Sequence, residues 1–280
     1  MVEREKEMMK IATAITTAVT VAILVLFGNA SSVLASGVKG HNNGCPSDSA
    51  RVGSWCVDKY EASIWESTDK KMIRNIQKGK VRSANKLHGK ATRRGDGVDD
   101  YDEAGCPDSG NGCTGVYAAS IPGVRPSVFM NWMQATAACR NSGKELLPNA
   151  VWQAAALGTP DPGHAGDGTN TCNTNTTGPV PTGTTGDCIS DTGIFDMVGN
   201  VDEWVADWAP ITDGCVTPLF GSGDFNCYAA ANRPSIGGPG PLSRGGSWGV
   251  ASSAGVFNVV VWRNLETQTD HFGFRCGRVR

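Results

Sequence analysis

The stretch GIFDMVGNVDEWVADW, residues 193–208, brings acidic side chains, glycines and an apolar run together in one short segment. Asp196 and Glu203 supply carboxylates, and the backbone carbonyls of Gly199 and Val201 lie between them along a tight turn. Carboxylate and carbonyl oxygens are the ligands that calcium prefers in proteins. We therefore expect a structural Ca²⁺ site formed by these four residues. The alternative is that the two acids only cap and solvate the turn.

The overall composition limits the classes of partner. The chain has 25 Lys and Arg residues against 27 Asp and Glu residues, so no global positive field attracts nucleic acid, and we expect no such partner. Its 36 glycines and its charged fraction of only 19% predict a loop-rich fold. The length of 280 residues is enough for one large domain or two small ones.

The N-terminal segment has the pattern of an export signal. Basic residues precede an uncharged apolar run over 11–27, and Val33, Leu34 and Ala35 follow with a small-x-small cleavage pattern. We expect residues 1–35 to be a signal peptide, 36–44 a linker and 45–280 the folded domain. The predicted location is secreted, periplasmic or at the cell surface. An uncleaved anchor through residues 11–27 is the alternative, and it is the only membrane contact we expect.

The cysteines indicate structural disulfides. Ten cysteines, an even number, are typical of an exported, disulfide-bonded chain, and no CxxC motif points to zinc or redox chemistry. Four sequential pairs flank turn-forming residues, and the remaining two would close a long loop, a bridge that contributes up to about 5 kcal/mol. The predicted bridges are Cys45–Cys56, Cys106–Cys113, Cys172–Cys188, Cys215–Cys227 and Cys139–Cys276.

A charged insertion is expected at about residues 66–120. Ten Lys or Arg residues lie between Lys70 and Arg94, and five acidic residues follow at once, between Asp96 and Glu103. A solvated insertion whose two halves neutralise each other explains this better than a binding tract. Within it, GDGVDDYDEAGCP clusters oxygen ligands around glycines, as calcium loops do, although a polar turn is the simpler interpretation.

The helical signal is confined to residues 127–158. Apolar side chains recur at helical spacing from Phe129 to Cys139, and the segment from Asn141 to Gly143 predicts the end of that helix. A second, short helix is expected after Pro148, capped by Asn149 and ending at Gly158. The rest of the chain towards the C-terminus predicts short strands and long loops.

Four stretches in order resemble the formylglycine-generating (sulfatase-modifying factor) family. They are VDKYEAS at 57–63, GKELLPNAVWQAAA at 143–156, the opening stretch at 193–208, and RGGSW…GFRC from Arg244 to Cys276. The resemblance implies an α+β fold, a disulfide-stapled variant of the C-type lectin fold. It also implies a structural calcium at the positions of the 193–208 turn. Asp202 stands where that family usually has an aromatic residue.

The same resemblance addresses the question of catalysis. Enzymes of the family use two cysteines after the GGS turn to bind copper and activate oxygen, and thereby convert a sulfatase cysteine to formylglycine. The matching positions here are Val250 and Gly255, which cannot ligate a soft metal, so we expect no copper. The histidines carry no metalloprotease motif, and neither a nucleophile elbow nor a phosphate loop is present. An oxidase of unrecognised type remains the enzymatic alternative.

The C-terminal stretch also resembles ligand-binding C-type-lectin proteins of diversity-generating systems. That resemblance implies an exposed face between the GGSW turn and GFR, which would bind a protein or glycan at the cell surface. The alternative is a core strand with Phe257, Val259 and Val261 facing inward and Asn258, Val260 and Trp262 facing outward. A self-assembling subunit of a fibre or layer is a further possibility. The expected face consists of Trp248, Val250, Ser252, Asn258, Val259, Val261, Arg263, Gln268 and Asp270.

Overall fold

The computed structural model describes five stretches of the chain, and residues 42–280 form one compact unit. Among the described residues, no helix is long and apolar enough to cross a membrane. The predicted signal segment and the Cys215–Cys227 bridge lie outside the described residues. The described stretches are 44–97, 100–161, 171–210, 239–261 and 263–280.

An antiparallel sheet joins the two ends of the folded unit. Its strand order is β1-β2-β11-β6, so the last strand lies between β2 and β6, in the middle of the sheet. Gly277 in β11 pairs with Val57 in β2 on one side and with Glu145 in β6 on the other. The strands are β1 (Ser49–Val52), β2 (Trp55–Asp58), β6 (Glu145–Leu146) and β11 (Cys276–Val279).

The predicted charged insertion contributes β4 and β5 to a second sheet, in which β3, just before the insertion, is the middle strand. Its basic and acidic halves meet, because the Arg94 guanidinium lies 3.1 Å from the Glu103 carboxylate. Asp100 accepts three backbone N–H groups from 95–97, which is the geometry of a polar turn. The elements are β3 (Ala62–Glu66), α2 (Lys70–Gln77), η1 (Ala84–Lys86), β4 (Thr92–Arg94), α3 (Asp100–Glu103) and β5 (Val116–Ser120).

Two helices occupy the region predicted to be helical. Helix α4 (Trp132–Asn141) begins after Asn131, whose side chain and that of Gln134 form a capping box. Helix α5 (Asn149–Ala155) is preceded by Pro148 as its N-cap. Asn149 is therefore the first residue of the helix and not its cap, as the sequence had suggested.

A third sheet, with strand order β10-β7-β8-β9, separates two hydrophobic clusters. Trp204 and Phe272 pack into one cluster with α4, whereas Val205 and Val259 pack into the other with α5. Strand β10 runs parallel to β7, and the other pairs are antiparallel. The elements are β7 (Asp202–Pro210), β8 (Pro239–Gly245), η2 (Ala251–Ser253), β9 (Gly255–Val260) and β10 (Phe272–Phe274).

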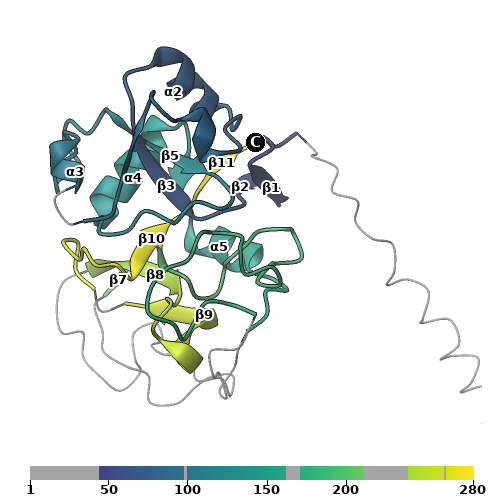
Figure 1. Ribbon diagram of the computed structural model, residues 1–280. Coiled ribbons are helices and arrows are strands. Elements are labelled where there is room, and N and C mark those ends of the chain that lie inside the picture. Colours follow the sequence, from purple (N-terminus) through teal and green to yellow (C-terminus); the bar gives the residue numbers. More distant parts are fainter. Residues whose placement is uncertain (1–43, 98–99, 162–170, 211–238, 262) are drawn as a thin grey trace, which may run out of the picture. The chain divides into compact units, whose positions relative to one another are not determined.

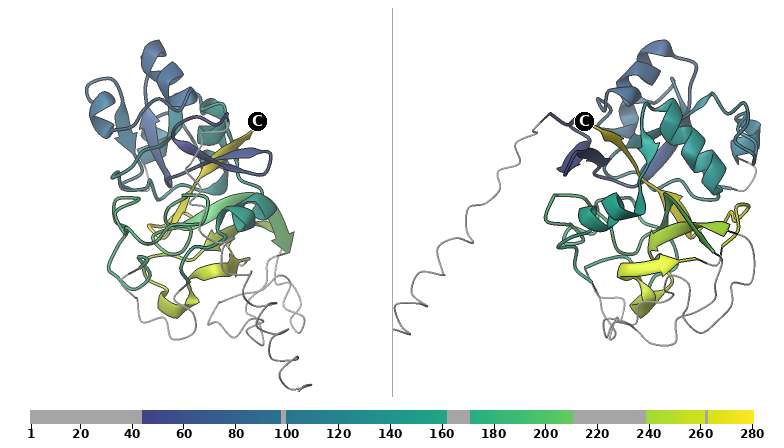
Figure 2. Two further views of the ribbon diagram at one scale, coloured as in Figure 1. Left: turned by 90° about the vertical axis from the view of Figure 1, so that its right-hand side faces the viewer. Right: turned by 180° about the vertical axis from the view of Figure 1, so that it is seen from behind.

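The views agree on how these sheets are connected. Figure 1 shows α2, α3 and α4 gathered around β3 and β5, with the sheet of β7, β8 and β9 below them. Strands β10 and β11 follow one another from the lower sheet towards the upper one, as Figure 2 also shows from behind. The C-terminal segment thus ties the two regions together.

Four of the five predicted disulfides are confirmed. Three of them close short loops, whereas Cys139–Cys276 spans 137 residues and joins α4 to β11. All the cysteines in the described residues are bonded. The other three bridges are Cys45–Cys56, Cys106–Cys113 and Cys172–Cys188.

Candidate functional site

Asp202 and Glu203, adjacent at the start of β7, have side chains in different environments. Glu203 is paired across the sheet with Arg244, and its side chain is buried beside Arg275. The Arg275 Nε atom lies 2.8 Å from each Glu203 carboxylate oxygen, and the Trp152 indole N–H donates to Oε2 over 2.7 Å. Both oxygens of Glu203 therefore have strong donors within the protein.

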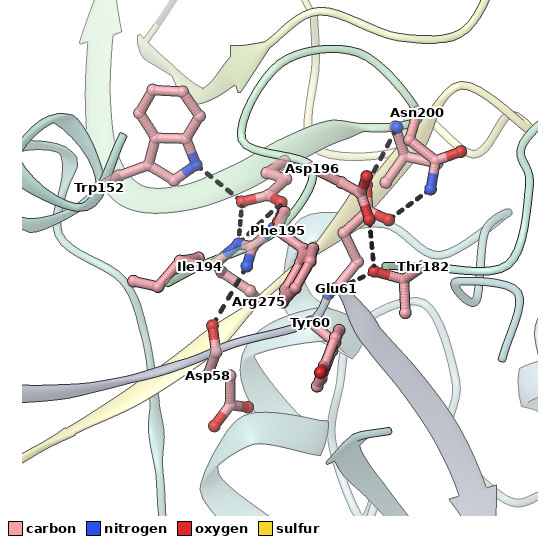
Figure 3. Close-up of polar contacts among 12 residues, drawn as sticks. Asp58, Tyr60, Glu61, Trp152, Thr182, Ile194, Phe195, Asp196, Asn200 and Arg275 are labelled. Atoms are coloured by element: carbon pink, nitrogen blue, oxygen red, sulfur yellow. Dashed lines mark hydrogen bonds and ion pairs between the residues drawn. The ribbon is translucent and has the colours of Figure 1, made fainter. Parts of the chain in front are cut away.

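Each nitrogen of the Arg275 guanidinium donates a hydrogen bond within the protein. Besides Glu203, it donates to the backbone carbonyls of Asp58, at 3.1 Å, and Phe195, at 2.8 Å. Figure 3 shows Arg275 between Trp152 and Asp58, with Glu61, Asp196 and Asn200 nearby. A buried charge is tolerated when it is both paired and hydrogen-bonded, and this one meets both conditions.

Asp196 and Glu61 complete the same buried cluster. Asp196 Oδ2 accepts hydrogen bonds from the Thr182 hydroxyl, at 2.8 Å, and from the Gly183 N–H, at 2.6 Å. Glu61 accepts from the Asn200 amide and from the backbone N–H of Val201. Burial, together with the nearby charges of Asp196 and Glu203, raises the pKa of Glu61 well above its usual range.

Two of the predicted calcium ligands, Asp196 and Glu203, already accept hydrogen bonds from protein groups. Glu203 is engaged by a guanidinium, and Asp196 is engaged by hydroxyl and N–H donors, including the Thr185 hydroxyl at 2.7 Å from Oδ1. A calcium ion needs six to eight oxygen ligands. Within the described stretches, no group of three His, Cys, Asp or Glu side chains converges to hold a metal ion. Calcium binding through Asp196, Gly199, Val201 and Glu203 stays a prediction from sequence.

A cavity of about 330 Å³ lies on the other side of β7, where Asp202 points. It is enclosed by the GGS turn, strand β9 and the segment that enters β10. Val250, Val260 and Phe272 give it apolar walls. Its polar lining residues are Asp202, Ser247, Ser253, Asn258, Arg263 and His271.

The polar groups of this cavity are only partly paired. Oδ1 of Asp202 and Oδ1 of Asn258 are buried and have no hydrogen-bond partner among the described residues. The Ser247 hydroxyl lies 2.8 Å from Nδ1 of His271, and Ser247 also hydrogen-bonds Asp202. Burial raises the pKa of Asp202 to about 7, against the opposing effects of the Arg263 charge and of these hydrogen bonds. Burial also lowers the pKa of His271.

An aromatic stack, the Trp248 rim, adjoins the cavity through its lining residue His271. The rings of Trp248 and His271 lie 4.4 Å apart between centroids and 13° from parallel. The Trp248 indole N–H donates to the backbone carbonyl of Asp270 at 3.2 Å, which fixes the orientation of the ring. Trp248 is half-buried, so part of its face remains accessible to a partner.

The structure brings together only some of the residues expected on the binding face. Val250, Asn258 and Arg263 line the cavity, and Trp248 lies at its rim. The half-buried Ser252 lies in η2, beside this loop.

Gln268 and Asp270 point elsewhere. The Gln268 amide donates to Asp108 over 2.6 Å, and Asp270 lines a separate hollow with Arg93 and Arg125.

Strand β9 corrects the remaining part of that expectation. Val259 and Val261 are exposed by only 5% and 1% and pack in the core, so neither side chain lies on an exposed binding face. Phe257, which the core-strand interpretation had turned inward, is 44% exposed. Trp262 lies outside the described residues.

Four polar residues of the cavity, Asp202, Ser247, Ser253 and His271, were not expected from the sequence. Asp202 drew notice only because it replaces an aromatic residue, and His271 drew none, because the histidines carry no metalloprotease motif. Ser247 is part of the quoted GGSW turn but had no assigned role. The one usable signal was an acid at position 202, where the family usually has an aromatic residue.

The chain matches one known protein family, and its fold is similar to several solved structures. The family model described as the sulfatase-modifying factor enzyme 1-like domain matches residues 17–279. The fold is similar to that of the Major Tropism Determinant M1 variant, with TM-score 0.46 and 16% identity over 84% of this chain and 54% of that one. It is also similar to PvdO from Pseudomonas aeruginosa, with TM-score 0.38 and 15% identity over 81% of this chain and 94% of that one.

Another solved structure, Treponema denticola variable protein 1, is 21% identical, with TM-score 0.34 over 49% of this chain and 48% of that one. No curated protein sequence matches. The chain spans about half the length or less of the tropism determinants it matches, between 37% and 54%. At these identities the structural similarities concern the fold alone.

Proposed function

This chain belongs to the sulfatase-modifying factor enzyme 1-like family, and we propose that it serves as a recognition module without the family's oxidase chemistry. It binds a protein or glycan ligand outside the cytoplasm, through the cavity beneath the GGS turn and the Trp248 rim. The observation that carries this proposal is the cavity itself, which is concave and largely apolar and includes two buried acceptors, on Asp202 and Asn258, that have no donor among the described residues.

The residues at the two thiol positions support binding over oxidation. Val250 is part of the cavity wall, and Gly255 begins β9. Neither side chain can form a thiolate, and every cysteine in the described stretches is already in a disulfide. An apolar wall at this point suits contact with a ligand.

The disulfides support a location in an oxidising compartment. Four bridges in the described residues are typical of secreted and extracellular proteins, because cytosolic thiols are kept reduced. Secretion and display at the cell surface, as the N-terminal pattern predicts, are part of the proposal.

The burial of Val259, Val260 and Val261 gives no support to self-assembly through the apolar segment Val259–Trp262. Val259, Val260 and Val261 are all buried, so their side chains offer no apolar surface to a second copy. We therefore do not extend the proposal to a fibre or layer subunit.

A binding screen tests the proposed site. The folded domain is applied to arrays of extracellular proteins and of glycans, and each hit is measured again with Arg263→Ala and Val250→Asp. We expect both variants to lose the hit by at least about tenfold, while Leu157→Ala, at an exposed position away from the cavity, retains it.

Two results would contradict the proposal. One is a ligand whose affinity is the same for the wild-type domain and both cavity variants. The other is catalysis: if the domain, incubated with copper, oxygen and a sulfatase-motif peptide, converts the peptide cysteine to formylglycine, the oxidase alternative is correct. Mass spectrometry of the peptide reports this conversion directly.

A further inference from the structure

Two buried acceptors in the cavity lack donors. Oδ1 of Asp202 and Oδ1 of Asn258 have no hydrogen-bond partner in the described part of the chain, and these residues are only 5% and 2% exposed. The Asn258 amide nitrogen is already used, because it donates to the Ser253 carbonyl at 2.6 Å. A buried acceptor without a donor is destabilising, so a ligand that supplies donors to both atoms recovers that cost.

The strand register explains why these two acceptors share a cavity. Glu203, Arg244 and Val259 lie in line across β7, β8 and β9. Asp202 precedes Glu203 in this row, so its side chain points to the opposite side of the sheet. Asn258 lies where the register of β9 shifts, and its side chain lines the same cavity as Asp202.

The charges in the cavity disfavour an ionic ligand. Arg263 also lines it, with its guanidinium carbon 5.4 Å from the centroid of the Phe272 ring. A ligand ammonium group would therefore approach a second cation, whereas a ligand carboxylate would place more acceptors against Asp202. A neutral group that donates hydrogen bonds avoids both penalties.

The size and the walls of the cavity restrict the ligand further. A volume of about 330 Å³ is at the small end of the range for ligand sites, which suits one inserted side chain. Val250, Val260 and Phe272 present apolar surface beside the two acceptors. The inserted group therefore combines methylenes with a donor-rich, uncharged tip.

We infer that the cavity binds a primary carboxamide, the side chain of an Asn or Gln on a protein partner. The amide nitrogen carries two N–H donors, one for each of the acceptors on Asp202 and Asn258. The methylenes of the side chain pack against the apolar walls, which a sugar diol does not match. This inference rests on the proposed function, because it names the group by which a protein partner is recognised.

A titration with small amides tests this chemistry without knowledge of the partner. Propionamide and N,N-dimethylpropionamide are added separately to the ¹⁵N-labelled domain, and amide chemical shifts are followed. We expect propionamide to shift the Asn258 side-chain resonances and to bind about tenfold or more tightly than the dimethyl compound, which has no N–H donor. Equal binding of the two, or tighter binding of propylammonium or propane-1,2-diol, would overturn the inference.

The Asn258→Leu variant tests whether propionamide binds in the cavity. Asn258→Leu keeps similar bulk but removes the acceptor, and we expect propionamide to bind it no better than the dimethyl compound. Leu157→Ala serves as the matched control, and the backbone spectrum of each variant reports whether the fold is retained. Undiminished propionamide binding by folded Asn258→Leu would contradict the inference.

The two proposals can fail separately. If array hits are lost in the Arg263 and Val250 variants but propionamide does not bind, the site stands and the carboxamide is wrong. If propionamide binds as expected but no array hit depends on Arg263 or Val250, the carboxamide chemistry stands and the proposed recognition function is wrong.

Discussion

Asp202 and Glu203 are neighbours in β7, yet one lines a cavity and the other lies in a closed cluster. Glu203 accepts from Arg275 and Trp152 on the core side of the sheet. Asp202 faces the opposite side and keeps one oxygen without a protein donor among the described residues. The two acids are similarly buried, at 5% and 1% exposure, so burial does not distinguish them.

The difference between them is one of hydrogen-bond satisfaction. A buried acid whose oxygens all have donors stabilises a single arrangement of the chain and has little capacity left for a ligand. A buried acid with an unmatched oxygen costs stability in the free protein, and a ligand that supplies the donor recovers that cost. We therefore associate the Arg275 cluster with the fold and the Asp202 cavity with recognition.

The largest predicted effect comes from making the same change at both neighbours. Glu203→Gln removes the charge that balances buried Arg275, so we expect it to lower the free energy of unfolding by about 3–5 kcal/mol. Asp202→Asn removes a poorly compensated buried charge, so we expect it to change that free energy by less than about 1 kcal/mol, or to raise it. Urea denaturation followed by tryptophan fluorescence measures both.

If the two substitutions lowered the free energy of unfolding by similar amounts, the assignment of the Arg275 cluster to stability and of the Asp202 cavity to binding would be contradicted. Binding provides the reverse comparison: Asp202→Asn weakens propionamide binding while it preserves the fold. An exposed acid, changed by Asp187→Asn, supplies the baseline for an acid-to-amide substitution that affects neither region.

A smaller effect is expected from pH, through Asp58 beside the Arg275 cluster. Its carboxylate lies 2.7 Å from Lys144 Nζ, with Asp48 and Arg278 also acting on it, and burial raises its pKa from 3.8 to about 6. As pH rises from about 4 to 6, the unfolded state loses the Asp58 proton before the folded state does. The contribution of Asp58 to stability therefore falls over that window and is constant above it.

Melting curves between pH 4 and pH 7 check this prediction. Asp58→Asn is uncharged at every pH, so its stability should decline less steeply than that of the wild type between pH 4 and 6. The same slope in the variant and in the wild type would show that Asp58 does not titrate in this window. Asp187→Asn again serves as the control.

The smallest predicted effect is that of calcium. Because the oxygens of Glu203 and Asp196 already accept from protein donors, we expect the melting midpoint to be the same with a chelator and with millimolar Ca²⁺. A ligand that binds only the folded state raises the midpoint. A rise on addition of calcium that Asp196→Asn abolishes would restore the site predicted from the sequence and place this cluster among binding sites.

Features contained in short segments of the chain could be predicted from the sequence, whereas the cavity, which depends on distant segments, could not. The four ordered stretches were enough to indicate the fold family, and the spacing of cysteines gave the four disulfides in the described residues. The end of α4 near Gly143 was also predictable, because Gly143 has a φ of +66°, which favours glycine. Each of these signals is contained in short segments.

The cavity was not predictable in the same way. It depends on a parallel pairing of Phe272 with Asp202, two residues far apart in the sequence. It also depends on a shift of register in β9, where Arg244 pairs with Val259 but Gly245 pairs with Gly255. That irregularity breaks the simple alternation along the strand, so Phe257 does not share the inward side of Val259.

The central position of β11 has a consequence for how the protein is made. Arg275 donates to the carbonyl of Asp58, which lies 217 residues earlier, and β11 pairs with both β2 and β6. A growing chain therefore cannot complete this sheet, close the Cys139–Cys276 bridge or neutralise Glu203 until β11 has left the ribosome. Folding of the sheet waits for β11, and a product truncated before it exposes the edges of β2 and β6.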